Sequence, residues 1–287
     1  MANTPTTTST VAPALLAKWV EQYIREKLFP TLLLPALITH GDLRGKRSKT
    51  WSSPQWGGAT AKGVDEDVAV ESDAMTLTNK DITVSEIAVS LEPTDLSVET
   101  SDIQPADYGA RGVIAVKQKL ERDIAALFAG VTQSVGTSGQ EVSLDTLIKA
   151  MELLETADDE GPYFGVIHPR QVGAYRRAIA GTSGSTAAVY GTGIVDPALK
   201  AIPGFVGDFL GVPLFKSTYV PKVNTNTDFA GCFFSMKAFG MATLREPRVE
   251  AERSAKKRTT AMVVTAVYGV GELEANSAVR VISKVAA

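Results

Sequence analysis

Two histidines and one cysteine are the side chains of this sequence best suited to catalysis or metal binding. A zinc site takes three or four ligands, and neither His40 nor His168 has a second histidine or a cysteine at ligand spacing. The single cysteine, Cys232, excludes an internal disulfide and any metal site built from cysteines. Because Cys232 lies in the apolar run GCFF, we expect a small buried side chain there. The sequence therefore predicts no metal site and no cofactor.

His168 is the candidate for a catalytic base, since Ser-His-Asp triads are assembled from residues far apart in the chain. The accompanying motif is missing: no GxSxG elbow occurs, and GTSGST at 181–186 lacks a strand-then-helix context. The phosphate-binding patterns GxxxxGK[ST] and strand-linked GxGxxG are also absent. His168 directly precedes Pro169, which favours a structural turn. We predict a protein that is not an enzyme, and a hydrolase using His168 is the enzymatic alternative.

Charged residues gather in a few short stretches. The acidic runs at 65–67 and 158–160 do not match a calcium-binding loop, and we expect solvated surface at both. The most basic stretch contains Arg245, Arg248, Arg253, Lys256, Lys257 and Arg258. Glu246, Glu250 and Glu252 alternate with these cations, which favours ion pairs with a neighbouring subunit over contacts with nucleic-acid phosphates. We therefore predict subunit-interface roles for Arg248, Arg253 and Lys257.

The composition is that of a folded protein. The 287 residues carry a formal net charge of −3, and 44% are hydrophobic while 21% are charged. This balance provides no global basic field for nucleic acid. No run of about 18 apolar residues occurs, so we expect no membrane-spanning helix. The Thr-rich start lacks the charged and apolar succession of a signal peptide, and we expect a soluble protein from a reducing compartment.

The longest predicted element is a helix over residues 105–130. Pro105 suits a first helical position, and apolar residues recur at three- and four-residue spacing as far as Phe128. Gly130 is typical of a helix end. A helix of this length is a rod of about 35 Å. Strand-rich sequence on both sides indicates that the rod crosses an extended, flattish molecule, with a long core helix of an ordinary α+β enzyme as the alternative.

An N-terminal arm is predicted over residues 1–45. Residues 1–13 are rich in Thr, Ser and Pro, so we expect order there only upon binding. Residues 14–29, which include Trp19, fit an amphipathic helix. The following FPTLLLPALITHG, which includes Leu33, is apolar but has too few neighbours of its own to bury its surface. Trp19 and Leu33 are therefore candidate contacts with another copy of the chain.

Residues 46–92 are predicted to form an extended β-hairpin loop. Apolar residues alternate through TLTNKDITVSEIAVSLEP, which indicates either two strands joined at 78–81 or one long ribbon with a bulge. The segment carries so few large residues that it cannot form a core alone. We expect it to project and to lie on another surface, with Leu77 and Ile82 as candidate interface residues.

The rest of the chain mixes helices and strands, which predicts an α+β protein. Helices are expected at 143–156 and 170–180, and a glycine-rich loop at 181–197. Strands are expected at 163–167, 232–235, 239–244, 259–270 and 278–285.

This order of parts resembles the major capsid proteins of tailed bacteriophages, which have the HK97-like fold. Residues 75–130 look like the extended loop and the spine helix of the peripheral domain. GFVGDFLGVPLFKSTYVP at 204–221 is similar to the end of the axial domain, and 235–284 to the closing peripheral strands. The resemblance implies an N-terminal arm at 1–45, an extended loop at 46–92, a peripheral domain with the spine helix at 93–135, an axial domain at 136–232, and a return to the peripheral domain at 233–287.

The resemblance implies self-assembly into hexamers and pentamers that form an icosahedral shell around packaged double-stranded DNA. It also implies assembly in the host cytoplasm, a place in the virion, and scaffolding, portal and decoration proteins as partners. Some family members crosslink a lysine to an asparagine, but Lys62, Lys80 and Asn276 do not stand out as such a set, and we expect no crosslink. No long helical extension precedes the arm, so we expect a separate scaffolding protein or none. A bacterial compartment shell of the encapsulin type, which shares the fold and encloses cargo enzymes, is the structural alternative.

Overall fold

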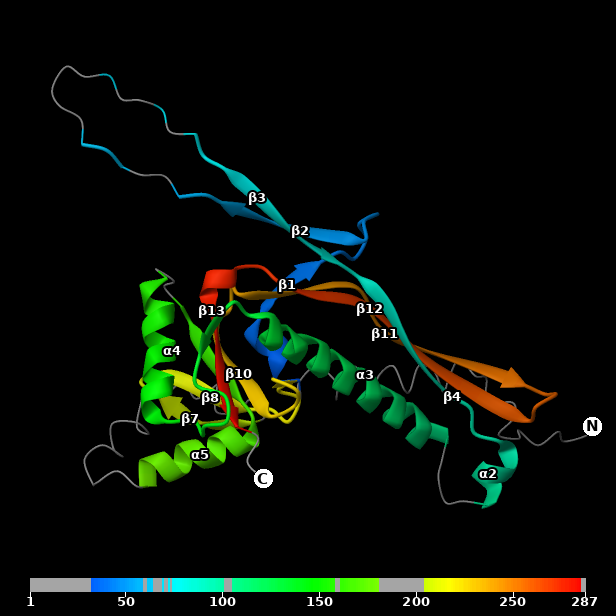
Figure 1. Ribbon diagram of the computed structural model, residues 1–287. Helices are drawn as coiled ribbons and strands as arrows, with labels where there is room; N and C mark the ends of the chain where they lie inside the picture. The colour runs from blue at the N-terminus through cyan, green and yellow to red at the C-terminus, as the bar shows by residue number, and fades with distance from the viewer. Residues whose placement is uncertain are drawn as a thin grey trace, which may run out of the picture.

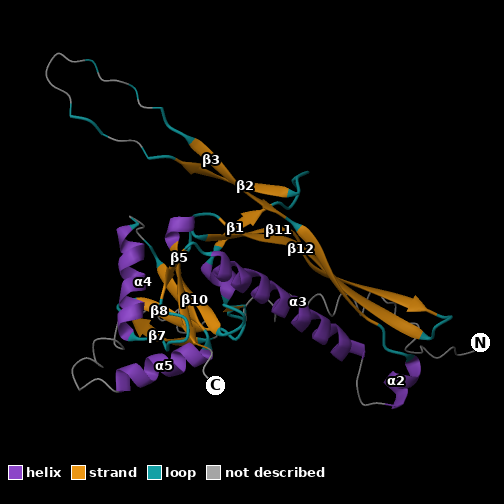
Figure 2. Cartoon of the chain, viewed as in Figure 1, coloured by secondary structure: helices purple, strands orange, loops and turns teal. Residues whose placement is uncertain are grey.

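A computed structural model describes residues 32–58, 61–63, 69, 72, 74–100, 105–157, 161–180 and 204–284. The described part is extended: a β-hairpin projects from one end of a mixed body, and a long strand pair projects from the other (Figure 1). Helices and strands are both well represented (Figure 2), as the predicted α+β class requires. The predicted helix at 14–29 with Trp19, the acidic runs and the loop at 181–197 lie wholly or largely outside the described residues.

Helix α3 (Pro105–Leu127) lies along the body and continues into the 3-10 turn η3 (Phe128–Gly130), which confirms the predicted long helix. One face of α3 and η3 packs into the core through buried residues at three- and four-residue spacing: Val113, Val116, Leu120, Ile124 and Phe128. A Cβ atom at Gly112 would lie 2.9 Å from the Val264 side chain. A residue without a side chain therefore lets the helix approach the sheet closely.

The sheet beneath α3 has the strand order β1–β11–β12–β4. Strands β11 (Phe239–Ser254) and β12 (Thr259–Glu272) form a long antiparallel hairpin, and β4 (Ser85–Leu91) pairs with β12. Strand β1 (Thr39–Asp42) joins β11 in parallel. Strand β11 continues ten residues beyond the predicted end at 244, because β12 supplies hydrogen-bonding partners through the charged stretch. The short helix α2 (Asp95–Thr100) lies at the far end of this hairpin, where the Asp95 N–H donates to the Arg258 carbonyl at 2.9 Å.

Strands β2 (Thr50–Trp56) and β3 (Leu77–Thr83) form a separate two-stranded sheet, which is the projecting hairpin of Figure 1. Residues 78–81 lie within β3, so the turn expected there is wrong. The alternative of one long ribbon with a bulge describes the extended path of the segment, but the structure divides it at Val84 into two strands of different sheets. At Val84 the ribbon leaves β2 and passes directly into β4, whose partner is β12. The Val84 N–H donates to the Lys49 carbonyl at 2.9 Å at this junction. Alternation predicts a strand, but it does not identify the partner.

A seven-stranded sheet forms the other half of the body, in the order β5–β13–β10–β6–β8–β7, with β9 also pairing with β10. Its strands are β5 (Gln133–Val135), β6 (Tyr163–Ile167), β7 (Phe205–Phe209), β8 (Val212–Lys216), β9 (Lys222–Val223), β10 (Asp228–Ser235) and β13 (Ala278–Lys284). Every residue of the central strand β10 is buried. Helices α4 (Leu144–Thr156) and α5 (Pro169–Ala180) lie beside this sheet (Figure 2), close to their predicted positions.

Strand β13 differs from the expected division of the chain, which assigned 233–287 to the peripheral part. It lies between β5 and β10, in the same sheet as β6 and β8, and has no partner in the β11–β12 sheet. The burial of Val279 and Val281 follows from their alternation, but alternation does not specify which sheet buries them.

The core is divided between the two sheets, with α3 packed against the junction. The largest buried cluster joins residues of α3, β10, β11 and β12 with the short 3-10 turn η2 (Leu34–Leu37), and a second cluster joins α4 and α5 to the seven-stranded sheet. The turn η4 (Ala275–Ser277) connects β12 to β13. Within the part of the chain that the structure describes, no helix is long and apolar enough to cross a membrane.

Candidate assembly surfaces

His168, the sequence candidate for a catalytic base, occupies the turn before α5. Its ring stacks on Phe229 with centroids 3.6 Å apart, and the ring Nδ1 accepts the backbone N–H of Arg170 at 3.2 Å. The backbone N–H of His168 donates to Gln171 Oε1 at 2.9 Å. Burial, then the charges of Arg170 and Lys222, lower the pKa of His168 to about 4. Among the described residues no carboxylate or hydroxyl hydrogen-bonds to the ring, so the geometry is that of the expected structural turn.

The described residues contain no group of three or more His, Cys, Asp or Glu side chains that could hold a metal ion. Cys232 is fully buried in β10, and burial raises the pKa of its thiol. A buried neutral thiol of this kind is inert, as expected from its apolar neighbours in sequence.

Three large apolar side chains lie exposed beside the outer end of the projecting hairpin. Trp56 is 68% exposed, Met75 54% and Leu77 52%. The hairpin is two-stranded, and no other helix or strand among the described residues covers it at this point (Figure 1). Exposed apolar side chains gathered on a projecting ribbon are typical of a surface that another chain covers.

Ile82 has a different role from the predicted one. It is buried to 3% exposure in a small core cluster with Leu43, Val84, Ala242 and Leu273. Ile82 and Leu77 lie on the same strand, but Ile82 lies at the base of the hairpin, where it meets the body. The side chain therefore fixes the hairpin to its own chain and is not available to a neighbouring subunit.

The entry of the N-terminal arm into the body is held by a buried carboxylate that sequence reasoning missed. Glu121 Oε1, on α3, accepts the N–H groups of Leu33 at 2.6 Å and Leu34 at 3.3 Å. Burial raises the pKa of Glu121, although these two hydrogen bonds and Lys117 oppose the shift. Leu33 itself is buried against its own chain, whereas Trp19 lies outside the described residues. The helical position of Glu121, next to Leu120 and three before Ile124 on the apolar stripe, is the signal that could have identified it.

The basic stretch near the end of the β11–β12 hairpin forms ion pairs within the chain. Arg253 holds Asp95 of α2 through two hydrogen bonds of 2.6 Å, Arg248 pairs with Glu250, and Arg245 pairs with Glu86 of β4. Ion pairing was predicted for this stretch, but with a neighbouring subunit. Lys257, in the turn between β11 and β12, is exposed.

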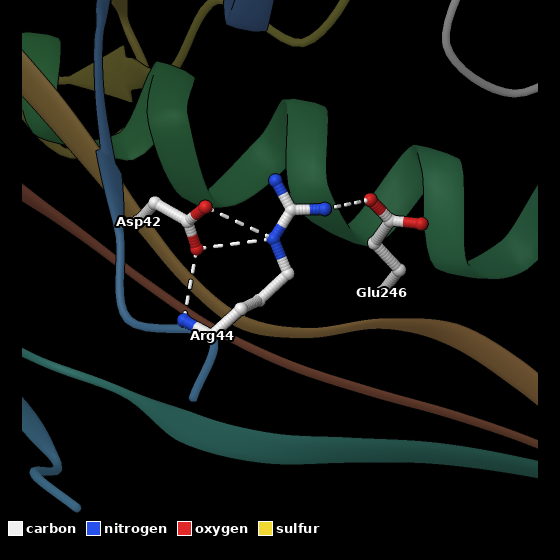
Figure 3. Close-up of polar contacts among 3 residues, drawn as sticks. All are labelled: Asp42, Arg44 and Glu246. Atoms are coloured by element: carbon white, nitrogen blue, oxygen red, sulfur yellow. Dashed lines mark hydrogen bonds and ion pairs between the residues drawn. The ribbon is translucent and has the colours of Figure 1, made fainter. Parts of the chain in front are cut away.

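A second cluster of charges, also missed, lies where β1 leads into the projecting hairpin. Arg44 donates from Nε to both Asp42 oxygens, at 3.0 and 3.1 Å, and from Nη1 to Glu246 Oε1 at 2.5 Å (Figure 3). The hydrogen bonds from the Arg44 side chain and N–H lower the pKa of Asp42. The run RGKRSK at 44–49, with four cations in six residues, is the sequence signal for this surface.

Comparisons with known proteins identify the fold. Among solved structures, the chain is similar to that of Mycobacterium phage Che8, at 17% identity and a TM-score of 0.68, with 87% of this chain and 90% of that chain covered. The head structure of Helicobacter pylori bacteriophage KHP40 matches at 11% identity and a TM-score of 0.68, with 90% of each chain covered. The holo-SrpI encapsulin complex from Synechococcus elongatus PCC 7942 matches at 13% identity and a TM-score of 0.61, with 98% of this chain and 91% of that chain covered.

At identities this low, the structural similarity establishes a shared fold and no more. Phage heads and encapsulin shells have this fold in common. No relative of this sequence is found among curated proteins. The sequence profile of the phage capsid protein family, however, matches residues 106–281, which is more than half of the chain. The matched region runs from α3 into β13 and so contains the strands of the seven-stranded sheet and the β11–β12 hairpin, but not β1 or β4. The chain therefore belongs to the phage capsid protein family, has the HK97-like fold, and is a structural protein of the phage shell.

Proposed function

We propose that this protein assembles, without catalytic turnover or cofactor, into hexamers and pentamers that form an icosahedral shell around packaged double-stranded DNA. Assembly takes place in the host cytoplasm, with a separate scaffolding protein or none, and with portal and decoration proteins as further partners. The single observation that carries the proposal is the projecting β2–β3 hairpin, whose Trp56, Met75 and Leu77 are left exposed by the part of the chain that the structure describes.

The energetic argument follows from the hairpin's construction. A two-stranded ribbon is marginally stable in water unless a further layer covers it. Each large apolar side chain that a neighbour buries contributes about 1.5–3 kcal/mol, at roughly 25 cal/mol per Å² of apolar surface. Many small contacts of this kind, repeated in a closed ring, hold the shell together. Because they form only with the folded subunit, they also stabilise its fold by mass action.

The same surfaces would serve an encapsulin-type compartment, because the fold is shared. The membership of the phage capsid family favours the genome as the contents. The two functions differ in what the particle holds: a phage shell encloses nucleic acid, whereas a compartment shell encloses cargo enzymes.

The test is expression of the protein alone and with the scaffolding candidate of its genome, followed by size-exclusion chromatography and negative-stain electron microscopy. Closed shells, capsomer rings or sheets are the expected result. Particles purified from infected or induced cells should contain nuclease-protected DNA. A protein that stays monomeric or dimeric under crowding and with scaffold would overturn the shell function, and empty shells that co-purify with a cargo enzyme would favour the compartment.

A further inference from the structure

A cleft lies where α3 meets the seven-stranded sheet. Its walls are α3, the first residue of α5 and the segment that begins at the end of β8, and its volume is about 440 Å³. Its polar lining consists of Lys117, Glu121, Lys216, Ser217, Thr218 and Tyr219. In Figure 1, α5 and β8 lie on the side of the body away from the projecting hairpin. The cleft and the exposed apolar hairpin are therefore separate surfaces of the molecule.

Positive charge lines the cleft and its edge. Lys117 of α3 and Lys216 of β8 are among the lining residues. Arg122, one residue after Glu121 on α3, places its guanidinium carbon 5.6 Å from the centroid of the Tyr219 ring. A cation over an aromatic face is held in position without losing its charge.

Two more cations lie on the α5 side. Arg170 follows Pro169, which lines the cleft. The Nζ of Lys222 lies 5.9 Å from the centroid of the Phe229 ring, on which His168 stacks. The charges of Arg170 and Lys222 both lower the pKa of His168, as expected where the local potential is positive. The cleft together with these five cations is here called the cationic cleft: Lys117, Arg122, Arg170, Lys216 and Lys222.

Part of this charge is available to a ligand. Arg122, Lys216 and Lys222 are exposed and form no ion pair with any residue that the structure describes. Glu121 is the one carboxylate among the described lining residues, and its Oε1 already accepts two main-chain N–H groups. The paired arginines of β11 differ, because each has a carboxylate partner. The chain as a whole carries a charge of −3, so attraction of a polyanion depends on a local cluster such as this one.

The uncharged polar groups of the cleft also suit phosphate. Ser217 Oγ accepts the Tyr219 N–H at 3.3 Å, which leaves its O–H to donate, and the Thr218 side chain adds a second hydroxyl. Lysine ammonium groups bind phosphate as point charges, and hydroxyls donate to phosphate oxygens. No Asn or Gln, the side chains that pair with adenine edges, is among the described lining residues. Such a site contacts a nucleic-acid backbone without reading its bases.

We propose that the cationic cleft binds backbone phosphates of the packaged duplex DNA, independently of base sequence. This inference rests on the proposed function, in which the shell encloses duplex DNA. Cations that neutralise phosphates release the counterions condensed on the duplex, and this release drives the association. An acidic protein segment is the other polyanion that the cleft could take. DNA is favoured because a filled shell offers phosphate at high local concentration to every copy.

The test measures binding of labelled duplexes of about 20 base pairs to soluble subunits by fluorescence anisotropy. The cleft variant carries Arg122→Gln, Lys216→Gln and Lys222→Gln, and circular dichroism checks its fold. The wild type should bind two duplexes of unrelated sequence equally, and the cleft variant should bind them at least tenfold more weakly. The slope of log affinity against log salt concentration should fall by about one for each cation removed. A strong preference for one sequence would contradict backbone recognition and overturn the inference.

A matched control removes the same charges elsewhere. Lys256→Gln, Lys257→Gln and Arg258→Gln take two lysines and one arginine from the exposed turn between β11 and β12. This control should bind duplex DNA within twofold of the wild type, and a loss equal to that of the cleft variant would overturn the inference. A poly-glutamate peptide that binds the wild type more tightly than the duplex does, and is lost in the cleft variant, would assign the cleft to an acidic protein instead.

Lysine acetylation read by mass spectrometry tests the unsubstituted protein. Bound duplex should slow acetylation of Lys216 and Lys222 at least threefold and leave Lys256 and Lys257 unchanged. Absence of this protection would overturn the inference, even where shells form. Because both measurements use soluble subunits, they do not depend on assembly. A wild type that binds duplex DNA through the cleft but forms no shell with scaffold present would overturn the proposed function alone.

Discussion

Glu121 Oε1 accepts the N–H of Leu33 at 2.6 Å, across 88 residues of sequence. The contact joins the long helix α3 to the point at which the N-terminal arm enters the body, and the second N–H, from Leu34, strengthens it. A carboxylate in the core is costly unless hydrogen-bonded, so its presence here indicates a specific role in fixing the path of the arm.

Glu121→Ala should lower the free energy of unfolding by about 2–4 kcal/mol, because it leaves two buried N–H groups without an acceptor. Glu121→Gln retains a carbonyl oxygen and should cost less than about 1 kcal/mol. Urea denaturation of soluble subunits measures both. Glu152→Ala, on the exposed face of α4, is the control and should change stability by under about 0.5 kcal/mol. Equal losses in the Ala and Gln variants would show that the hydrogen bonds are not what matters.

Glu121 and Asp228 should give opposite dependences of stability on pH. The folded-state pKa of Glu121 is raised, so the folded chain binds that proton more tightly, and stability from this group falls as pH rises through the range above 4.5. The stability of Glu121→Gln relative to the wild type should therefore increase between pH 4 and pH 7. A constant difference across this range would contradict the raised pKa.

Asp228 is buried, and burial alone would raise its pKa. Hydrogen bonds from Ser138, Asn224, Gly139 and Thr227 outweigh burial and hold the pKa below its usual 3.8. The contribution of the ionised Asp228 to folding stability is present above pH 3.8 and is lost as pH falls through the lowered pKa. Asp228→Asn should therefore be destabilising at pH 7, and the deficit should shrink toward pH 3. Denaturation curves at pH 3, 5 and 7 measure it, and a deficit that grows on acidification would be the contrary result.

Substitutions at Leu77 and Ile82, which lie on the same strand, should affect different properties: assembly at Leu77 and folding stability at Ile82. Ile82→Ala should cost about 2–5 kcal/mol in subunit stability, because it empties space in a packed cluster. Leu77→Asp should leave the melting temperature of the subunit within a few degrees and reduce the yield of closed shells. Calorimetry and electron microscopy of the same preparations measure the two effects. If Leu77→Asp gave shells at the wild-type yield, the outer hairpin would have no part in assembly.

His168 should titrate far below the usual range. Its folded-state pKa of about 4 lies under the ordinary 6.5, so the unfolded chain binds the proton more tightly and stability is lost as pH falls from 6.5 toward 4. His168→Phe keeps a ring against Phe229 and should flatten this loss. Two-dimensional NMR of the ring protons gives the pKa directly, and a midpoint near 6.5 would contradict the buried, stacked geometry.

The long helix could be predicted because Val113 to Phe128 repeat at helical spacing over many turns, and Pro105 marks its start. Helices α4 and α5 were predictable for the same reason, with Ser143 as a side-chain cap for α4. Local spacing and caps are properties of short windows of sequence, so such windows are sufficient to identify these elements.

Pairing between distant strands was harder to predict. The alternation from Leu77 to Leu91 is equally consistent with a hairpin turn at 78–81 and with one ribbon, because the choice depends on β2 and β12 elsewhere in the chain. The burial of Ile82 by Leu43 and Leu273 depends on the same distant pairings, so it could not be predicted from the local sequence. Ile82 was therefore assigned to an interface between subunits. Glu121 was overlooked because a charged residue on a helix is usually solvated, and its partners are main-chain groups, which carry no sequence signal.

The continuity of β3 and β4 has a mechanical consequence. A force that draws the hairpin outward along its length passes straight through Val84 into β4, which is registered with β12 over seven residue pairs. Antiparallel hydrogen bonds lie perpendicular to the strands, so such a force loads the ladder in shear, along its whole length at once, and cannot peel one bond at a time. The hairpin is thus built to carry tension into the edge strand of the β1–β11–β12–β4 sheet, which suits a wall that is strained from within.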